Sequence, residues 1–268
     1  MNEPDWAPES ADTTRSNVAR VYDTLLGGTH NFAADRDLAR AIRAVEPHVA
    51  TIARMNRAYL IRAARFLAED AGIDQFLDIG SGIPSEDNVH DVAQRANPEA
   101  RVVYVDNDPV AVAHTKAMLT DNYLAAAIRA DLRRPGEILA HPTVRNLLDF
   151  DRPVAVVLTS VLHFITDEDN PPAIVARLRD AVPPGSYLVI SHGTDEDRPG
   201  TAKAAAKVCG RAAPATPRSR QQILGLFAGW ELVEPGLVYL PEWRPSSPDE
   251  ACDHPEWCMM LACVGRKR

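Results

Sequence analysis

The sequence predicts an α/β protein with a doubly wound, mainly parallel sheet of seven strands and a helical extension at the N-terminus. Three observations support this fold class. Short apolar runs alternate with amphipathic segments through the middle of the chain, as in right-handed βαβ units. A glycine-rich turn follows the first of these runs. The last run follows an extended, proline-rich stretch instead of a helix, which favours an antiparallel last strand inserted into the sheet.

The composition is that of a globular chain, because 46% of its 268 residues are hydrophobic and 25% are charged. No apolar run approaches the roughly 20 residues of a membrane-spanning helix, so we expect no membrane partner. The formal net charge of −8 disfavours general binding to nucleic acid. Residues 1–16 are acidic and lack an apolar core, so we expect a disordered leader without a signal peptide, in a cytoplasmic protein.

Helical periodicity over residues 17–72 predicts an N-terminal extension that precedes a Rossmann-like domain over residues 73–268. Gly72 is a natural end for the last helix of the extension. The extension is expected to contain helices at 17–28, 35–45 and 51–72.

In the second domain, strands alternate with helices. The first five strands are expected at 75–80, 101–108, 126–131, 154–163 and 186–192. The helices between them are expected at 88–97, 109–122, 136–148 and 172–182. Two further extended runs, 231–240 and 257–267, complete the seven strands.

The turn after the first strand resembles only part of a dinucleotide fingerprint. Gly80 and Gly82 fit the first two glycines, but Pro84 and Ser85 stand where the third small residue belongs. Pro84 removes one N–H donor, and Ser85 is a suitable N-cap that would occupy another.

Negative charge in this turn disfavours a diphosphate. Glu86 and Asp87 are expected in the first turn of the following helix, where they would repel phosphate at the positive end of the helix dipole. S-adenosylmethionine fits better, because it has no phosphate and is cationic at its sulfonium and ammonium groups. Asp78 could accept a hydrogen bond from that ammonium group. Asp106 ends the second strand at the spacing where a carboxylate pairs with both ribose hydroxyls, although a turn residue would also suit that position.

The stretches QFLDIGSGIPSEDNVHDVAQ and RVVYVDNDPVAVAH resemble class I methyltransferases. Together with YDTLLGGTHNFAADRD, VLTSVLHFI and FAGWELVEPGLV, they look most like an actinobacterial family of S-adenosylmethionine-dependent methyltransferases long catalogued as a domain of unknown function. The resemblance covers roughly residues 15 to 265. It implies the seven-stranded methyltransferase fold and S-adenosylmethionine as cofactor, and it implies no substrate.

The resemblance also implies roles for individual residues. Asp106 would bind the ribose, with Asn107 beside the adenine, and Asp131 and Leu132 would contact the adenine through a carboxylate and a backbone amide. Asp131 could instead cap the next helix. The residues expected around the methionine part are Asp78, Gly80, Gly82, Thr159 and Ser160.

Two histidines are candidates for a general base. Methyl transfer from S-adenosylmethionine is a displacement at a carbon already activated by the sulfonium. It depends mainly on proximity and alignment, and it needs a base only when the acceptor must lose a proton. His163 and His192 follow the fourth and fifth strands, at the edge where the cofactor would lie. The alternative for either is a hydrogen-bonded residue at a strand end.

The run Asn170-Pro171-Pro172 resembles a motif of nucleic-acid methyltransferases, but it comes too late after the fourth strand and Ala173 replaces the aromatic residue. A helix that begins with proline explains it.

A metal site at Cys252, His254 and Cys258 is not expected, because paired C-x-x-C spacing is missing. Cys258 and Cys263 are expected as small buried side chains.

The N-terminal block predicts a lid over the cofactor. Tyr22 belongs to an apolar helix face, and the glycines that follow permit a sharp turn. We expect Tyr22, His30 and Asn31 to line the acceptor pocket. The alternative is a helical pair that packs outside the sheet.

The sequence therefore predicts an S-adenosylmethionine-dependent methyltransferase that acts on a small molecule. Two other functions stay open: a non-catalytic regulatory protein that binds S-adenosylmethionine, and, with less support from the loop, an NAD(P)-dependent oxidoreductase. The acceptor and the oligomeric state do not follow from the sequence.

Overall fold

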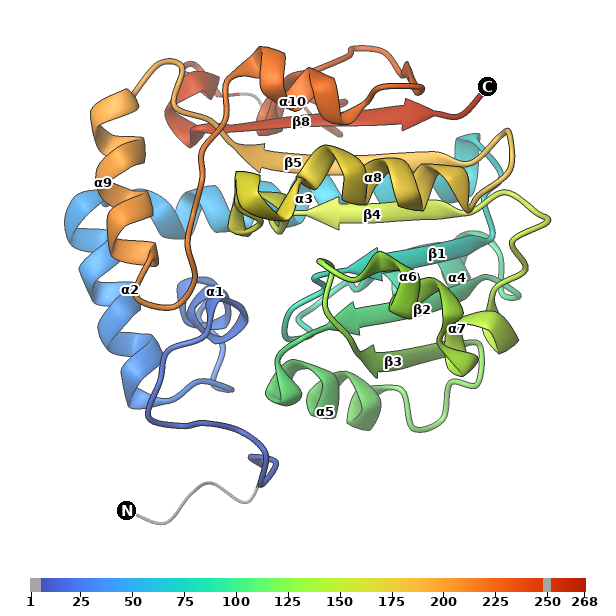
Figure 1. Cartoon of the computed structure of the whole chain (residues 1–268), viewed down its shortest axis with the longest axis horizontal. Coiled ribbons are helices and arrows are strands. Elements are labelled where there is room, and N and C mark those ends of the chain that lie inside the picture. The colour runs from blue at the N-terminus through green and yellow to red at the C-terminus, as the bar shows by residue number, and fades with distance from the viewer. Residues whose placement is uncertain (1–5, 248–251) are drawn as a thin grey trace.

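The computed structural model describes residues 6–247 and 252–268, which form one mixed sheet with helices on both faces (Figure 1). The order along the sheet is β3-β2-β1-β4-β5-β8-β6, and β7 pairs with β8. The strands are β1 (Gln75–Ile79), β2 (Arg101–Asp106), β3 (Ala125–Arg129), β4 (Ala155–Thr159), β5 (Tyr187–Gly193), β6 (Glu231–Leu232), β7 (Val238–Tyr239) and β8 (Met260–Arg266).

The sheet has the predicted class of topology. Strands β1 to β5 pair in parallel, and β8 runs antiparallel between β5 and β6. The antiparallel insertion of the last strand is therefore confirmed. The run 231–240 differs from the expectation of one strand, because a turn with Gly236 at φ +84° divides it into β6 and β7.

The helices between the strands include two that sequence periodicity did not predict, α9 and α10. The single helix expected at 136–148 is broken, because Pro142 forces His141 into extended backbone. Asn170 caps α8 and Pro171 begins it, as expected. These helices are α4 (Val89–Ala96), α5 (Pro109–Met118), α6 (Pro135–Ala140), α7 (Pro142–Leu147), α8 (Pro171–Asp180), α9 (Pro199–Cys209) and α10 (Arg220–Leu226).

The core has two layers because strand side chains alternate between faces. Phe76 and Val102 belong to the layer under α3 (Val49–Arg65), α4 and α5. Leu77 and Val103 belong to the opposite layer, under α6, α7, α8 and α10. Cys258 and Cys263 are buried, as expected, and burial raises the pKa of each thiol.

The N-terminal extension begins at the carboxyl edge of the parallel strands and then runs along one face of the sheet (Figure 1). It consists of α1 (Val18–Leu26), α2 (Ala33–Val45) and α3, which a short π-helical turn continues to Asp70. Helices α1 and α2 share a small core with the start of α3, and α9 packs against α2. No helix of the described residues is long and apolar enough to cross a membrane.

The expected disordered leader differs from the structure over residues 6–16. Trp6 stacks on Phe32, with 5.1 Å between the ring centroids. Trp6, Ala7 and Ala11 pack against a small apolar cluster that includes Val110 at the start of α5. The leader is packed because it covers apolar surface that belongs to segments far away in the sequence. Residues 1–5 lie outside the described residues.

Candidate cofactor and acceptor site

A cavity of about 390 Å³ lies at the carboxyl ends of β1, β2, β3 and β4. This is the edge where doubly wound sheets bind ligands, because the chain winds away from β1 in opposite directions there. The structure brings most of the expected cofactor residues together in its wall, namely Gly80, Gly82, Asp106, Asn107, Asp131, Leu132, Thr159 and Ser160.

The turn after β1 needs both of its glycines. Gly80 has φ +77° and Gly82 has φ +68°, which other residues adopt rarely. A side chain at Gly80 would also collide with Val161, because its Cβ would lie 2.4 Å from Val161 Cγ2. The backbone of the turn can therefore approach a ligand closely.

Asp106 links this turn to β2. Its Oδ2 accepts from Gly82 N (2.8 Å) and its Oδ1 accepts from Asp108 N (2.8 Å). Burial raises the pKa of Asp106 to about 6, although these hydrogen bonds oppose the shift. The side chain thus has the turn role considered above, and it also lines the cavity where a ribose diol would need an acceptor.

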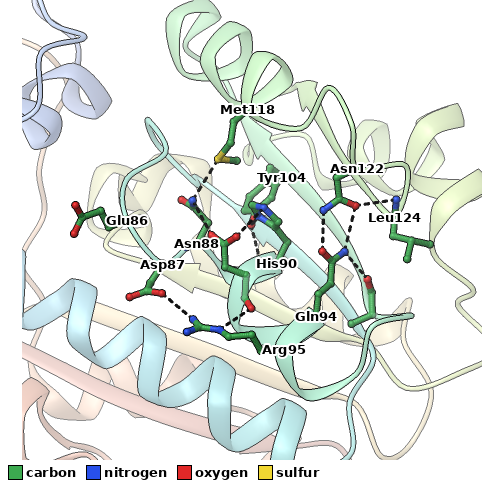
Figure 2. Close-up of polar contacts among 12 residues, drawn as sticks. Glu86, Asp87, Asn88, His90, Gln94, Arg95, Tyr104, Met118, Asn122 and Leu124 are labelled. Atoms are coloured by element: carbon green, nitrogen blue, oxygen red, sulfur yellow. Dashed lines mark hydrogen bonds and ion pairs between the residues drawn. The ribbon is translucent and has the colours of Figure 1, made fainter.

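The start of α4 differs from the prediction. The helix begins at Val89 with Asn88 as its N-cap, and Asn88 N donates to Asp91 Oδ2 (2.8 Å; Figure 2). Ser85 is therefore not the cap, and Glu86 and Asp87 precede the helix instead of occupying its first turn. Asp91 supplies the acidic first turn in their place, so the helix start still disfavours a phosphate.

On the side of the cavity where adenine is expected, the carboxylate of Asp131 is hydrogen-bonded to Arg133. Asp131 accepts from Arg133 N (2.9 Å) and from Arg133 Nε (3.0 Å), and the hydrogen bonds to Arg133 lower its pKa. This is the local role considered as the alternative for Asp131. Its contact with an adenine amine stays a prediction.

Asp78 lies behind the cavity wall. Its neighbours Leu77 and Ile79 belong to the opposite core layer, so Asp78 faces the layer under α3 and α4. It is 3% exposed, and burial raises its pKa to about 7. Because its side chain does not line the cavity, direct acceptance from the cofactor ammonium is not supported.

A polar chain connects the end of β4 to the N-terminal extension. Ser160 has φ +54°, and its N–H donates to Ser191 Oγ (2.8 Å). Ser191 Oγ donates to Asn56 Oδ1 (2.5 Å), and Asn56 Nδ2 donates to Tyr22 Oη (3.0 Å). Strained backbone of this kind persists where the surroundings hold it, often at functional sites. Tyr22 lines the cavity, as predicted.

The two candidate histidines have different positions. His163 lines the cavity, and its ring makes no hydrogen bond to a described residue. His192 is fully buried, with Nδ1 2.7 Å from Gly193 O and Nε2 3.0 Å from a nitrogen of Arg218. The structure therefore does not support a catalytic role for His192, since both ring nitrogens have partners in the protein and the residue does not line the cavity. Burial lowers the pKa of His163 to about 4 and that of His192 to about 3.

His30 and Asn31 do not line the cavity, contrary to expectation. Both residues donate hydrogen bonds to the buried carboxylate of Asp23, one from His30 N (3.0 Å) and one from Asn31 Nδ2 (2.8 Å). The His30 ring packs on His114, with 3.8 Å between the centroids. These residues therefore shape the turn between α1 and α2.

Part of the cavity wall was missed by sequence reasoning. One face of α9 and the segment after it line the cavity opposite α1 and α2. The face consists of Ala202, Ala205, Ala206 and Cys209, whose i, i+3, i+4, i+7 spacing is the signal that could have revealed it.

A buried arginine anchors the extension beside the cavity. Arg20 is 4% exposed, and its Nε donates to Asp108 Oδ2 (3.1 Å) at the start of α5. Its Nη1 lies 3.6 Å from Asp35 Oδ2 and donates to Asp12 O (3.1 Å), and its Nη2 donates to Arg15 O (3.0 Å). Leader, α1 and α2 are thus tied to the loop that follows Asp106.

Comparison with known proteins identifies the family. A family model described as S-adenosyl methyltransferase matches residues 4–268. The structure of a Streptomyces avermitilis protein from domain-of-unknown-function family 574 is similar, with 38% identity, a TM-score of 0.92, and coverage of 96% of this chain and 99% of that chain. A Thermobifida fusca protein with a provisional methyltransferase name shares 41% identity, with a TM-score of 0.93 and coverage of 99% and 100%.

More distant structures share the fold alone. Human N-acetylserotonin methyltransferase, solved with S-adenosylmethionine, has 15% identity and a TM-score of 0.52, covering 94% of this chain and 63% of that chain. No curated protein matches the sequence. The family match, the two close structures and the cavity at the sheet edge agree with the sequence-based resemblance. This chain therefore belongs to the family of S-adenosylmethionine-dependent methyltransferases.

Proposed function

We propose that the protein methylates a small, largely apolar molecule that binds between α1, α2, α3 and α9. The observation that carries this proposal is the continuity of the cavity. The same space that meets Gly80 and Asp106 at the sheet edge extends between these helices. Its volume of about 390 Å³ lies in the range of small-molecule sites.

The chemistry of the helical wall supports an apolar acceptor. Leu25, Leu38 and Ile42 line it from α1 and α2, opposite the alanine face of α9. Glu46 is the acidic residue of this wall, and it is 1% exposed and paired with Arg198 (2.8 Å). An anionic acceptor would therefore find hydrocarbon and an occupied ion pair in this part of the cavity.

We assign to His163 the contact with the acceptor atom. S-adenosylmethionine supplies a methyl carbon activated by its sulfonium. With a pKa of about 4, His163 is neutral at pH 7 and can accept a hydrogen bond from an acceptor O–H or N–H. Such a weak base orients the acceptor more than it removes the proton, so proximity supplies most of the rate.

The helices α1 and α2 act as a lid in this proposal. They wall the acceptor space, and Arg20 ties them to Asp108, two residues after the ribose-binding candidate. Amide exchange of the full chain should slow over residues 17–36 when S-adenosylhomocysteine binds. Unchanged exchange there would leave the alternative of a packed helical pair.

The acceptor class can be tested with labelled cofactor. S-adenosylmethionine carrying a radioactive methyl group is incubated with naphthols, naphthylamines, naphthoates, RNA and casein. We expect label in apolar, solvent-extractable products of naphthols or naphthylamines. Label only in acid-precipitable polymer would contradict the proposal, and no transfer to any acceptor would favour the non-catalytic binding protein.

A matched pair of variants tests the location of the acceptor. Ala206→Trp fills the helical half of the cavity and should abolish transfer without weakening S-adenosylhomocysteine binding. Lys203→Trp places the same bulk on the exposed face of α9 and should change neither. Equal activity of the two variants would place the acceptor elsewhere.

A further inference from the structure

The methionine end of S-adenosylmethionine carries an α-carboxylate that needs a cationic partner. Two arginines line the cavity among the described residues, Arg57 and Arg133. Arg133 is already bound to Asp131 through its Nε and Nη2. We propose that Arg57, on α3, binds the α-carboxylate of the cofactor. This inference rests on cofactor binding at the proposed site.

The guanidinium of Arg57 is only partly used by the protein. Its Nη2 donates to Asp87 O (2.8 Å), to Asn88 Oδ1 (3.2 Å) and to Glu86 O (3.3 Å). Its Nε is buried and has no hydrogen-bond partner among the described residues. A buried donor without a partner is costly, and a guanidinium presents its donors in a planar fork that matches a carboxylate.

The position of Arg57 agrees with the methionine end of the site. The preceding residue, Asn56, bonds to Ser191 on β5, which in turn holds Ser160 at the end of β4. Arg57 itself reaches the loop that follows the glycine turn of β1. It therefore lies by β1, β4 and β5, whereas the ribose and adenine candidates Asp106 and Asp131 follow β2 and β3.

A purely structural role is the competing explanation. In that case Arg57 only fixes the loop 86–88 through Nη2 (the residues Glu86, Asp87 and Asn88 are labelled in Figure 2). Loss of the loop contact would weaken every adenosine ligand equally. A carboxylate contact would weaken only ligands that carry the carboxylate, so the two roles are distinguishable by ligand choice.

The test is calorimetry with S-adenosylhomocysteine and with its decarboxylated analogue, which keeps the ammonium. The wild-type chain should bind S-adenosylhomocysteine about tenfold or more tightly than the analogue, as expected for a charge-assisted hydrogen bond. Arg57→Gln should lose about that factor for S-adenosylhomocysteine and less than about twofold for the analogue. Arg57→Lys should recover part of the loss.

Arg54→Gln is the matched control, because Arg54 is exposed on the same helix and its guanidinium donates to Thr51 Oγ1. It should leave both affinities unchanged. Equal losses for the two ligands in Arg57→Gln would overturn the inference, as would equal affinity of the wild-type chain for both, which needs no variant to fold. Absence of any S-adenosylhomocysteine binding by the wild-type chain would instead refute the cofactor site as a whole.

Discussion

Replacement of Asp78 by asparagine should stabilise the ligand-free protein at neutral and alkaline pH. Asp78 is 3% exposed, and no hydrogen bond to its carboxylate is found among the described residues. Burial raises its pKa from 3.8 to about 7, a shift that the nearby Arg57 opposes and Asp106 reinforces. The folded state thus disfavours the ionised carboxylate, and asparagine removes the charge with little change of shape.

The magnitude follows from the pKa difference between folded and unfolded chains. A raised pKa means that the folded chain binds this proton more tightly than the unfolded chain does. The stability that protonated Asp78 contributes is therefore fully present below about pH 3.8 and is lost as the pH rises to about 7. A shift of about three pH units corresponds to about 4 kcal/mol. The stability difference between Asp78→Asn and wild type should therefore grow by up to about 4 kcal/mol between pH 4 and 8.

Urea unfolding followed by circular dichroism measures this difference at each pH. Other carboxylates titrate over the same range, and those far from Asp78 cancel in the comparison because they titrate alike in both proteins. Asp106 interacts with Asp78, so its contribution belongs to the measured difference. Asp121→Asn, at an exposed position, is the control and should show no growth of the difference with pH. A difference between Asp78→Asn and wild type that stays constant from pH 4 to 8 would refute the reasoning.

Three further predictions concern the cofactor edge. Asp106→Ala should weaken S-adenosylhomocysteine binding by about 2 kcal/mol or more in calorimetry, and unchanged affinity in a folded variant would mean that the ribose is held elsewhere. Arg20→Met should lower the free energy of unfolding in urea by about 3–5 kcal/mol, because it leaves the buried carboxylate of Asp108 without its cationic partner. Asp108→Asn should restore part of the loss, and a loss below about 1 kcal/mol in Arg20→Met would contradict this explanation. Calorimetry should detect S-adenosylhomocysteine but no NAD, and tighter binding of NAD would overturn the interpretation of the glycine turn.

Most of the fold could be predicted because it depends on local patterns. Apolar runs of strand length that alternate with amphipathic segments indicate βαβ units wherever they occur, and the rule for doubly wound sheets then places the ligand at the end of β1. The exceptions have local causes of their own. Pro142 broke a predicted helix, and Asn88 capped α4 in place of Ser85. The helix α9 has weak hydrophobic periodicity, because its inner face consists of small residues and only Ala202 is fully buried.

The succession of strands and helices, the glycine turn and the position of Asp106 at the end of the second strand follow from the sequence alone, since each depends on a pattern within one segment. Only the tertiary structure decided which polar groups are free to act. His192, near the end of β5, is bound by Arg218, whereas His163, in the turn after β4, lines the cavity. Asn56 contacts Ser191 across 135 residues of sequence, and Arg57, the next residue of α3, lines the cavity. Periodicity encodes what a residue does within its own element, but the partner of a side chain depends on packing between elements far apart in the chain.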